Sequence, residues 1–241
     1  MHLLFAIATI LCYHEVDPPV DAHVTIPRLS ASSSATSEML RYTVTPENFA
    51  AQLDYLQQNG YHVIPLAQLV GWLRGDGATL PEKAVVITVD DGWLCAYTRI
   101  APELRRRDMP FTLFVYPSII GRGSHAVTWK DVSALAHDGV DIESHTMTHP
   151  FLTRLDAESL KCELEDSRDV VEAHTGTPVR FLSYPYGDYN AAVMQAAAQD
   201  GNDAAVTTWR GPITKETSPL ELKRYLIHND TTLEEFKTFL P

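Results

Sequence analysis

Short apolar runs alternate along this chain with longer segments in which apolar residues recur at helical spacing. The short runs are rich in Val, Ile, Leu and Phe, which is typical of strands buried on both faces. We expect strands at residues 10–14, 61–64, 85–89, 111–116, 140–143, 181–184, 204–207 and 224–228. We expect helices at residues 45–60, 66–73, 95–107, 129–136, 157–174, 191–198 and 233–240. This alternation predicts an α/β domain built on a parallel sheet.

The number of strand–helix units bounds the architecture. Seven or eight such units suit a (β/α) barrel, and we expect a distorted or incomplete one of about seven strands. The composition does not change after Arg41, so we expect one domain over residues 1–241 with its core at about 10–240. Residues 15–41 are rich in Pro and Ser and are expected to form a surface insertion.

Composition and charge narrow the class of protein and of partner. Of 241 residues, 45% are hydrophobic and 21% are charged, which is ordinary for a globular protein with a substantial core. The 31 acidic residues exceed the 19 basic ones, and a net charge of −12 argues against nucleic acid and anionic membranes as partners. Three widely spaced cysteines are expected to be free thiols: Cys12, Cys95 and Cys162.

Neither a membrane span nor an export signal is evident. No apolar run reaches the roughly 18 residues that cross a bilayer. The N-terminal segment is apolar, but it contains no Lys or Arg and no convincing cleavage site follows it. We therefore expect a first core strand there rather than a signal peptide.

The strand expected at 85–89 ends in Asp90, Asp91 and Gly92. Neighbouring strand residues point to opposite faces, but a turn assisted by glycine would let both carboxylates aim at one crevice. Active sites of barrels and open α/β sheets are assembled at this end of the strands. An Asp-Gly turn is ordinary turn chemistry, yet it leaves the second carboxylate unexplained. We therefore interpret both aspartates as functional.

His145 and His149 lie four residues apart, directly after another expected strand. If that turn is helical, both imidazoles lie on one face and can share a metal ion. Paired loop histidines are often merely exposed, but Asp91 offers a third ligand from a separate strand end. Two histidines and one carboxylate leave coordination positions open for water and substrate. Thr146 stands where H-E-x-x-H proteases carry their glutamate, so Asp90 is the candidate base.

Three motifs together resemble the polysaccharide deacetylases of carbohydrate esterase family 4, which carry the NodB homology domain. They are T-V-D-D-G at residues 88–92, S-H-T-M-T-H at 144–149 and Y-P-Y-G at 184–187. The resemblance covers nearly the whole chain. It implies that Asp90 is the general base and that Tyr186 donates its backbone N–H to the oxyanion. It also implies that a divalent metal is bound by Asp91, His145 and His149.

One departure from the family pattern concerns the base. Many members carry an arginine two residues before the proline, where this chain has Ser183. The usual charge partner of the base is therefore missing or replaced, and Arg180 is one candidate.

A particular branch of the family is similar to this chain at several further segments. They are F-L-S-Y-P-Y-G at 181–187, L-C-Y-H at 11–14, Y-T-V-T-P-E-N-F at 42–49 and N-G-Y-H-V at 59–63. That branch deacetylates poly-β-1,6-N-acetylglucosamine in biofilms, and its members are circularly permuted. The permutation implies that His14 is the general acid. His228, in L-I-H, fits the C-terminal motif of unpermuted members, and we favour His14.

The resemblance implies a hydrolase that removes N-acetyl groups from N-acetylglucosamine units of a polysaccharide, using metal-activated water, an Asp base and a His acid. Zinc suits the two nitrogens and one carboxylate, and cobalt, nickel or iron would also fit. Sugar platforms are sought among Trp93, Trp129 and Tyr186, although the two tryptophans fit core or rim packing equally well. Alternative substrates are chitin oligomers, peptidoglycan and O-acetylated glycans. An alternative hypothesis of another class is a non-catalytic carbohydrate-binding relic, that is, a family member that binds glycans but has lost turnover. The family resemblance implies a place in the cell envelope or outside the cell.

Overall fold

The computed structural model describes residues 7–18 and 40–241. A parallel sheet runs in the order β10-β1-β5-β6-β7-β8-β9, with β4 beside the first residues of β5. Its strands are β1 (Ala8–Tyr13), β4 (His62–Val63), β5 (Ala84–Val89), β6 (Thr112–Val115), β7 (Asp141–Ser144), β8 (Phe181–Ser183), β9 (Ala204–Val206) and β10 (Tyr225–Leu226). A separate two-stranded pair consists of β2 (Glu15–Val16) and β3 (Thr43–Val44).

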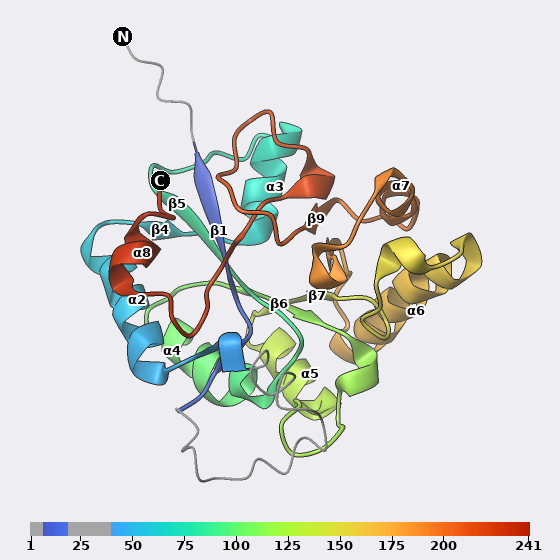
Figure 1. Cartoon of the computed structure of the whole chain (residues 1–241), viewed down its shortest axis with the longest axis horizontal. Coiled ribbons are helices and arrows are strands. Elements are labelled where there is room, and N and C mark those ends of the chain that lie inside the picture. The colour runs from blue at the N-terminus through green and yellow to red at the C-terminus, as the bar shows by residue number, and fades with distance from the viewer. Residues whose placement is uncertain (1–6, 19–39) are drawn as a thin grey trace.

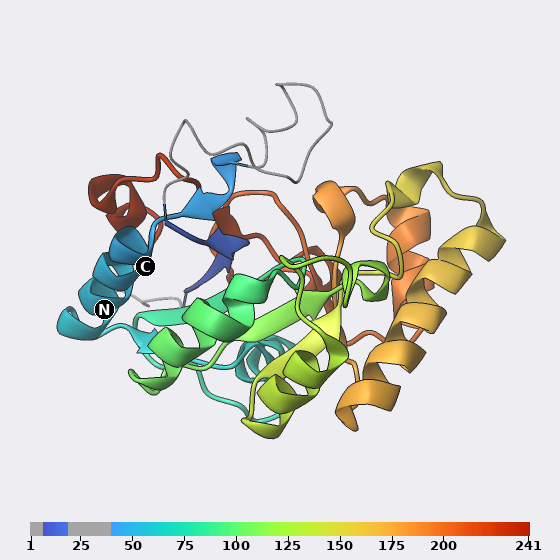
Figure 2. The same cartoon turned by 90° about the horizontal axis from the view of Figure 1, so that it is seen from below.

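Helices surround this sheet in Figure 1. They are α2 (Pro46–Gln58), α3 (Leu66–Arg74), α4 (Ala101–Arg105), α5 (Trp129–His137), α6 (Ala157–Thr175), α7 (Ala191–Gln199) and α8 (Leu233–Lys237). Side-chain oxygens of Thr45, Thr128, Asp156 and Asn190 accept a backbone N–H three residues on and so begin four of them. Figures 1 and 2 show α2 with α8 at one end of the molecule and α6 with α7 at the other.

The expected α/β fold with an incomplete barrel of about seven strands is confirmed. Between β9 and β10 the regular ladder gives way to a single bridge, from Val206 to Leu222. The apolar N-terminal segment forms β1, whose six residues are all buried. Residues 1–6 of the expected domain and residues 19–39 of the expected insertion lie outside the described residues. Within the described parts, no helix is long and apolar enough to span a membrane, and the three cysteines are free.

Successive side chains of β5 point to opposite faces of the sheet and so belong to two separate parts of the hydrophobic core. Val85, Ile87 and Val89 pack toward α2 and α5, in a cluster that includes Phe49 and Leu135. Ala84 and Val86 point the other way, into the barrel, where they meet residues of several other strands: Ile10, Phe114, Phe181 and Val206. Thr88 and Asp90 continue this inward face, because side chains two apart along a strand share a side. The strand therefore directs Asp90 into the barrel at the end where the parallel strands finish.

Strand β7 carries a pair of carboxyl groups, of which Glu143 is buried and Asp141 is half-buried. Glu143 of β7 is 1% exposed, and its Oε2 accepts the backbone N–H groups of Arg180 and Phe181 at 2.8 Å each. Burial, together with the nearby charge of Asp141, raises the pKa of Glu143 well above its ordinary value. Burial raises the pKa of Asp141 as well. Ionising this pair at high pH therefore opposes folding.

We expect Glu143→Gln to stabilise the fold at alkaline pH by on the order of 1 kcal/mol, because the glutamine carbonyl can accept the same two N–H groups without a charge. A raised folded-state pKa gives stability that is complete below the unfolded pKa and is lost as pH rises through the folded pKa. The advantage of the variant should therefore grow with pH. Thermal unfolding at about pH 6 and about pH 9 measures it, with the exposed Glu82→Gln as control. A variant less stable than the parent at the higher pH would refute this account.

Candidate active site

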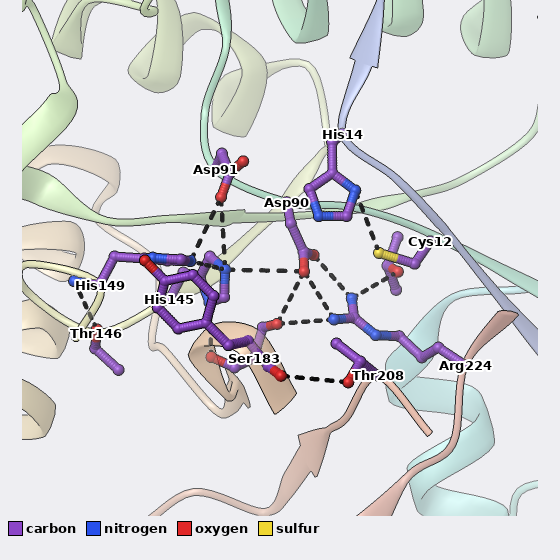
Figure 3. Close-up of polar contacts among 12 residues, drawn as sticks. Cys12, His14, Asp90, Asp91, His145, Thr146, His149, Ser183, Thr208 and Arg224 are labelled. Carbon is purple, nitrogen blue, oxygen red and sulfur yellow. Dashed lines mark hydrogen bonds and ion pairs between the residues drawn. The ribbon is translucent and has the colours of Figure 1, made fainter. Parts of the chain in front are cut away.

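Polar side chains from the ends of four strands, together with one from the start of a fifth, converge in Figure 3. His14 follows β1, Asp90 follows β5 and His145 follows β7. Ser183 is the last residue of β8, and Arg224 lies directly before β10, with its guanidinium reaching Asp90. Parallel strands end at one edge of their sheet, so side chains far apart in the sequence meet at this edge.

The charge partner of Asp90 is Arg224. Arg224 Nη1 donates to Asp90 Oδ1 at 2.8 Å, and its Nη2 donates to Asp90 Oδ2 at 2.7 Å. Ser183 Oγ donates to the same Oδ2 at 3.0 Å and accepts from Arg224 Nη2 at 3.0 Å. The prediction that Arg180 replaces the family arginine is wrong, because Arg180 is half exposed and pairs with Asp203 at 2.5 Å. A bidentate guanidinium fixes the plane of the Asp90 carboxylate as well as its charge.

The surroundings shift the pKa values of the two neighbouring aspartates in opposite directions. Burial alone would raise the pKa of Asp90, but the charge and hydrogen bonds of Arg224 outweigh it and hold that pKa well below its usual range. Burial raises the pKa of Asp91, with His14 opposing it. Such divergence between adjacent titratable groups is typical of sites in which each group has its own role. Asp90 is therefore ionised at neutral pH and able to accept a proton.

Asp91, His145 and His149 form a set that suits a metal ion. Asp91 Oδ1 lies 3.6 Å from His145 Nε2 and 3.7 Å from His149 Nε2, and the two nitrogens are 3.1 Å apart. Tetrahedral ligands on bonds of about 2.0–2.1 Å are separated by about 3.3 Å, so the spacing fits a cation of that geometry. Burial lowers the pKa of His145 to about 3 and also lowers that of His149, which keeps both imidazoles neutral and able to bind metal.

The loop carrying the two histidines is not helical, contrary to the condition under which they were expected to converge. Thr146 and His149 have left-handed backbones, with φ of 65° and 61°. Thr146 Oγ1 accepts the His149 N–H at 3.1 Å. Glu163 of α6 accepts both the N–H and the hydroxyl of Thr148, at 2.8 and 2.5 Å. His145 Nδ1 lies 2.7 Å from the Ser183 carbonyl, which directs its Nε2 toward the metal position.

A second group of potential ligands is less suited to a cation. One atom each of Cys12, His14 and Asp90 lie within 4.8 Å of one another. Both Asp90 oxygens already accept hydrogen bonds from Arg224. Burial raises the pKa of the Cys12 thiol well above its ordinary value, and the thiol is not the metal-binding form. The Asp91 set is therefore the candidate metal centre.

The two histidines considered as the acid occupy different positions. His14 borders both aspartates: burial lowers its pKa, while Asp91 and Asp90 act to raise it. The Tyr42 ring contacts both histidines, with its centre 4.7 Å from that of His14 and 5.2 Å from that of His228. The charges that affect the pKa of His228 come from outside the site. The structure thus brings His14, and not His228, beside Asp90 and Asp91.

Tyr186 lies at the rim of this site and is 55% exposed. Its backbone is left-handed, with φ of 60°. The next residue is Gly187, where a Cβ would lie 2.0 Å from Thr208 Oγ1. The Tyr186 ring contacts His149 edge-to-face at 4.6 Å. This places the tyrosine beside the candidate metal ligands.

The two tryptophans considered as sugar platforms have other contacts. Trp93 Nε1 donates to Asp91 Oδ2 at 3.0 Å, so this indole orients a candidate metal ligand. Trp129 stacks on His174 of α6, with ring centres 4.0 Å apart and planes at 8°. The sequence pattern alone indicates no role in the site for Arg224 or Glu163. The one available signal for Arg224 is a charged residue at the start of an otherwise apolar strand.

Comparison with known proteins extends these observations. A model of the polysaccharide deacetylase family matches residues 77–205. YxkH of Bacillus subtilis (strain 168), whose name assigns it to the polysaccharide deacetylases, is 30% identical over 199 residues, which cover 83% of this chain and 70% of that protein. The poly-β-1,6-N-acetyl-D-glucosamine N-deacetylase of Staphylococcus epidermidis is 24% identical over 223 residues, or 86% and 76% of the two chains.

Among solved structures, the fold is similar to that of the Streptococcus pyogenes deacetylase PplD in complex with acetate. The TM-score is 0.82 at 24% identity, and the match covers 98% of this chain and 99% of that one. At this identity the likeness concerns the fold.

Proposed function

The chain belongs to the polysaccharide deacetylase family, and on this premise we propose that it removes N-acetyl groups from N-acetylglucosamine units of a polysaccharide in a metal-dependent reaction. As a family member it is a hydrolase of N-acetyl amide bonds. One observation carries the finer proposal. The ligating atoms of Asp91, His145 and His149 converge next to Asp90, whose carboxylate Arg224 keeps ionised.

Zinc is the metal that we propose for this set. Two neutral imidazole nitrogens and one carboxylate oxygen suit Zn²⁺, and cobalt, nickel and iron remain alternatives. When bound, such a cation polarises an acyl oxygen and lowers the pKa of water toward ~7.

Asp90 serves as the base in this proposal. Its carboxylate is ionised and held in one orientation by Arg224 and Ser183, so it can take a proton from the attacking water. The Tyr186 N–H donates to the oxyanion, and removing one such donor typically costs about 3 kcal/mol of transition-state stabilisation.

His14 serves as the acid. Protonated at a ring nitrogen, it passes that proton to the amine as the C–N bond breaks, because an amide expels an unprotonated amine poorly. The carboxylates of Asp90 and Asp91 favour the protonated form of His14 against its burial. One water is consumed, and acetate and a glucosamine unit are formed.

Poly-β-1,6-N-acetylglucosamine is the proposed polymer. The similarity to the Staphylococcus epidermidis enzyme over most of both chains supports it. Chitin oligomers, peptidoglycan and O-acetylated glycans are the alternatives within the same chemistry. A polymer of this kind lies in or beyond the cell envelope, and we propose that the protein acts there.

Acetate release from matched acetylated oligomers tests the function. We expect release from β-1,6-linked N-acetylglucosamine oligomers, loss of release after chelation, and recovery on adding Zn²⁺. Chitin oligomers, peptidoglycan fragments and an O-acetylated glycan are assayed in parallel, and faster release from one of them would reassign the substrate. A protein that binds these glycans and Zn²⁺ but releases no acetate would be the binding relic.

A further inference from the structure

An aromatic stack extends from the metal ligands to the surface. The ring of Phe151, two residues after His149, lies on the Tyr186 ring with centres 4.1 Å apart and planes at 15°. Tyr186 in turn contacts His149 at 4.6 Å and 70°. The Arg154 guanidinium lies over the Phe151 ring, 4.2 Å from its centre. These four side chains, contributed by two separate segments, form one continuous column.

Both faces of the Phe151 ring are therefore covered. Two groups within about 4.2 Å of one ring centre occupy its opposite faces, so Tyr186 takes one face and Arg154 the other. A sugar platform needs an open ring face. Phe151 as a whole residue is 37% exposed, but the ring faces on which a sugar would pack are contacted by Tyr186 and Arg154.

Two residues of the column have unusual backbone conformations. His149 and Tyr186 both have left-handed φ, at 61° and 60°. Such conformations persist in residues other than glycine only where the surroundings hold them. Within the described residues, the His149 ring lies among other rings: Tyr116 at 5.0 Å, His145 at 4.5 Å and Tyr186 at 4.6 Å. The His149 ring is thus held by packing in addition to a hydrogen bond with its own backbone, whereas His145 is hydrogen-bonded to the Ser183 carbonyl.

We propose that Phe151 is a positioning residue that acts through Tyr186. By stacking on that ring, it holds the Tyr186 N–H toward the oxyanion and keeps the His149 imidazole in place for the metal. This inference rests on the proposed function, since it assigns roles within the same site. Arg154 acts with it by covering the outer face of the phenyl ring.

Three variants test the proposal: Phe151→Ala, Phe151→Leu and Phe151→Tyr. For Phe151→Ala we expect about 10-fold weaker Zn²⁺ binding, measured by chelator competition, because residues that orient a metal ligand typically contribute 10–100-fold. We also expect kcat on a β-1,6-linked N-acetylglucosamine oligomer to fall about 10-fold with KM nearly unchanged. Phe151→Leu keeps the apolar volume without a flat ring face, so its Zn²⁺ affinity and kcat should be nearly as low as those of Phe151→Ala. Phe151→Tyr keeps the flat face and should have nearly the parental Zn²⁺ affinity and kcat.

Tyr97→Ala is the matched control, because Tyr97 is an equally exposed ring, at 38%, on the separate helical segment η1 (Ala96–Ile100). It should leave the Zn²⁺ affinity and kcat unchanged. A rise in KM at constant kcat and constant Zn²⁺ affinity in Phe151→Ala would show a substrate platform and overturn the proposal. Unchanged values throughout would overturn it too. Zn²⁺ affinity is measured without substrate, so a failure of the deacetylase assignment is distinguished from a failure of the positioning role.

Discussion

Asp90→Asn is expected to lower acetate release by about 10²–10⁴-fold, which is the usual contribution of a general base, while the protein still binds its metal. Asparagine has nearly the same shape as aspartate but cannot accept the proton of the attacking water. The ligand set Asp91, His145 and His149 is untouched by the change. Rates and bound metal are measured on the same preparation, so that loss of the base is separated from loss of the site.

His145→Ala provides the contrast to that variant, since it removes a ligand whose Nδ1 is anchored to the Ser183 carbonyl at 2.7 Å. We expect it to lose both metal and rate. An Asp90→Asn protein that turns over at nearly the parental rate would remove Asp90 from the role of base. An Asp90→Asn protein that no longer binds metal would place Asp90 among the ligands instead.

Arg224→Met is expected to destabilise the protein by about 3–5 kcal/mol, because removing one partner of a buried ion pair leaves the other charge unpaired. Arg224 and Asp90 are 1% and 3% exposed, so water does not replace the guanidinium. Thr88 Oγ1 and the Thr207 carbonyl lose their arginine partner as well. Chemical denaturation at neutral pH measures the change in the free energy of unfolding.

The stability deficit of Arg224→Met is expected to depend on pH. Because Arg224 holds the folded-state pKa of Asp90 below its usual value, the pair stabilises the parent above the unfolded pKa, and that stability is lost as pH falls through the folded pKa. Without Arg224, burial raises the pKa of Asp90. The deficit of the variant should therefore be largest near neutral pH and shrink in acid. The acid limb of kcat/KM should also move to higher pH, since it reports the base of the free enzyme.

Arg180→Met is the matched control for that variant. Its ion pair with Asp203 is half exposed, and exposed pairs contribute about 0–1 kcal/mol. Rate and pH profile should stay as in the parent. If Arg224→Met were as stable as Arg180→Met, with an unmoved acid limb, Arg224 would not be the partner that controls Asp90. Combining Arg224→Met with Asp90→Asn should cost less than the sum of the two changes, because the unpaired charge is gone.

The sequence by itself predicted what depends on local periodicity. The run of apolar residues along β5, all of them buried, and the turn at Gly92 identify the strand end that carries Asp90 and Asp91. The rule that parallel strands end at one edge then predicts that His145 and His149 approach them. These inferences need only the direction of a strand and the identity of the residues that follow it, both of which are local properties of the chain.

Tertiary structure alone decided the partners within the site. Arg224 meets Asp90 across 134 positions of the chain, because β10 pairs with β1 in a register that sets Leu11 against Tyr225. No local pattern encodes that register. Likewise, the assembled structure places His14 among the charges of Asp91 and Asp90, whereas the charges around His228 come from other residues. Strand order and register arise from the packing of the whole sheet, so the residues that complete a site from distant segments emerge only when the sheet is assembled.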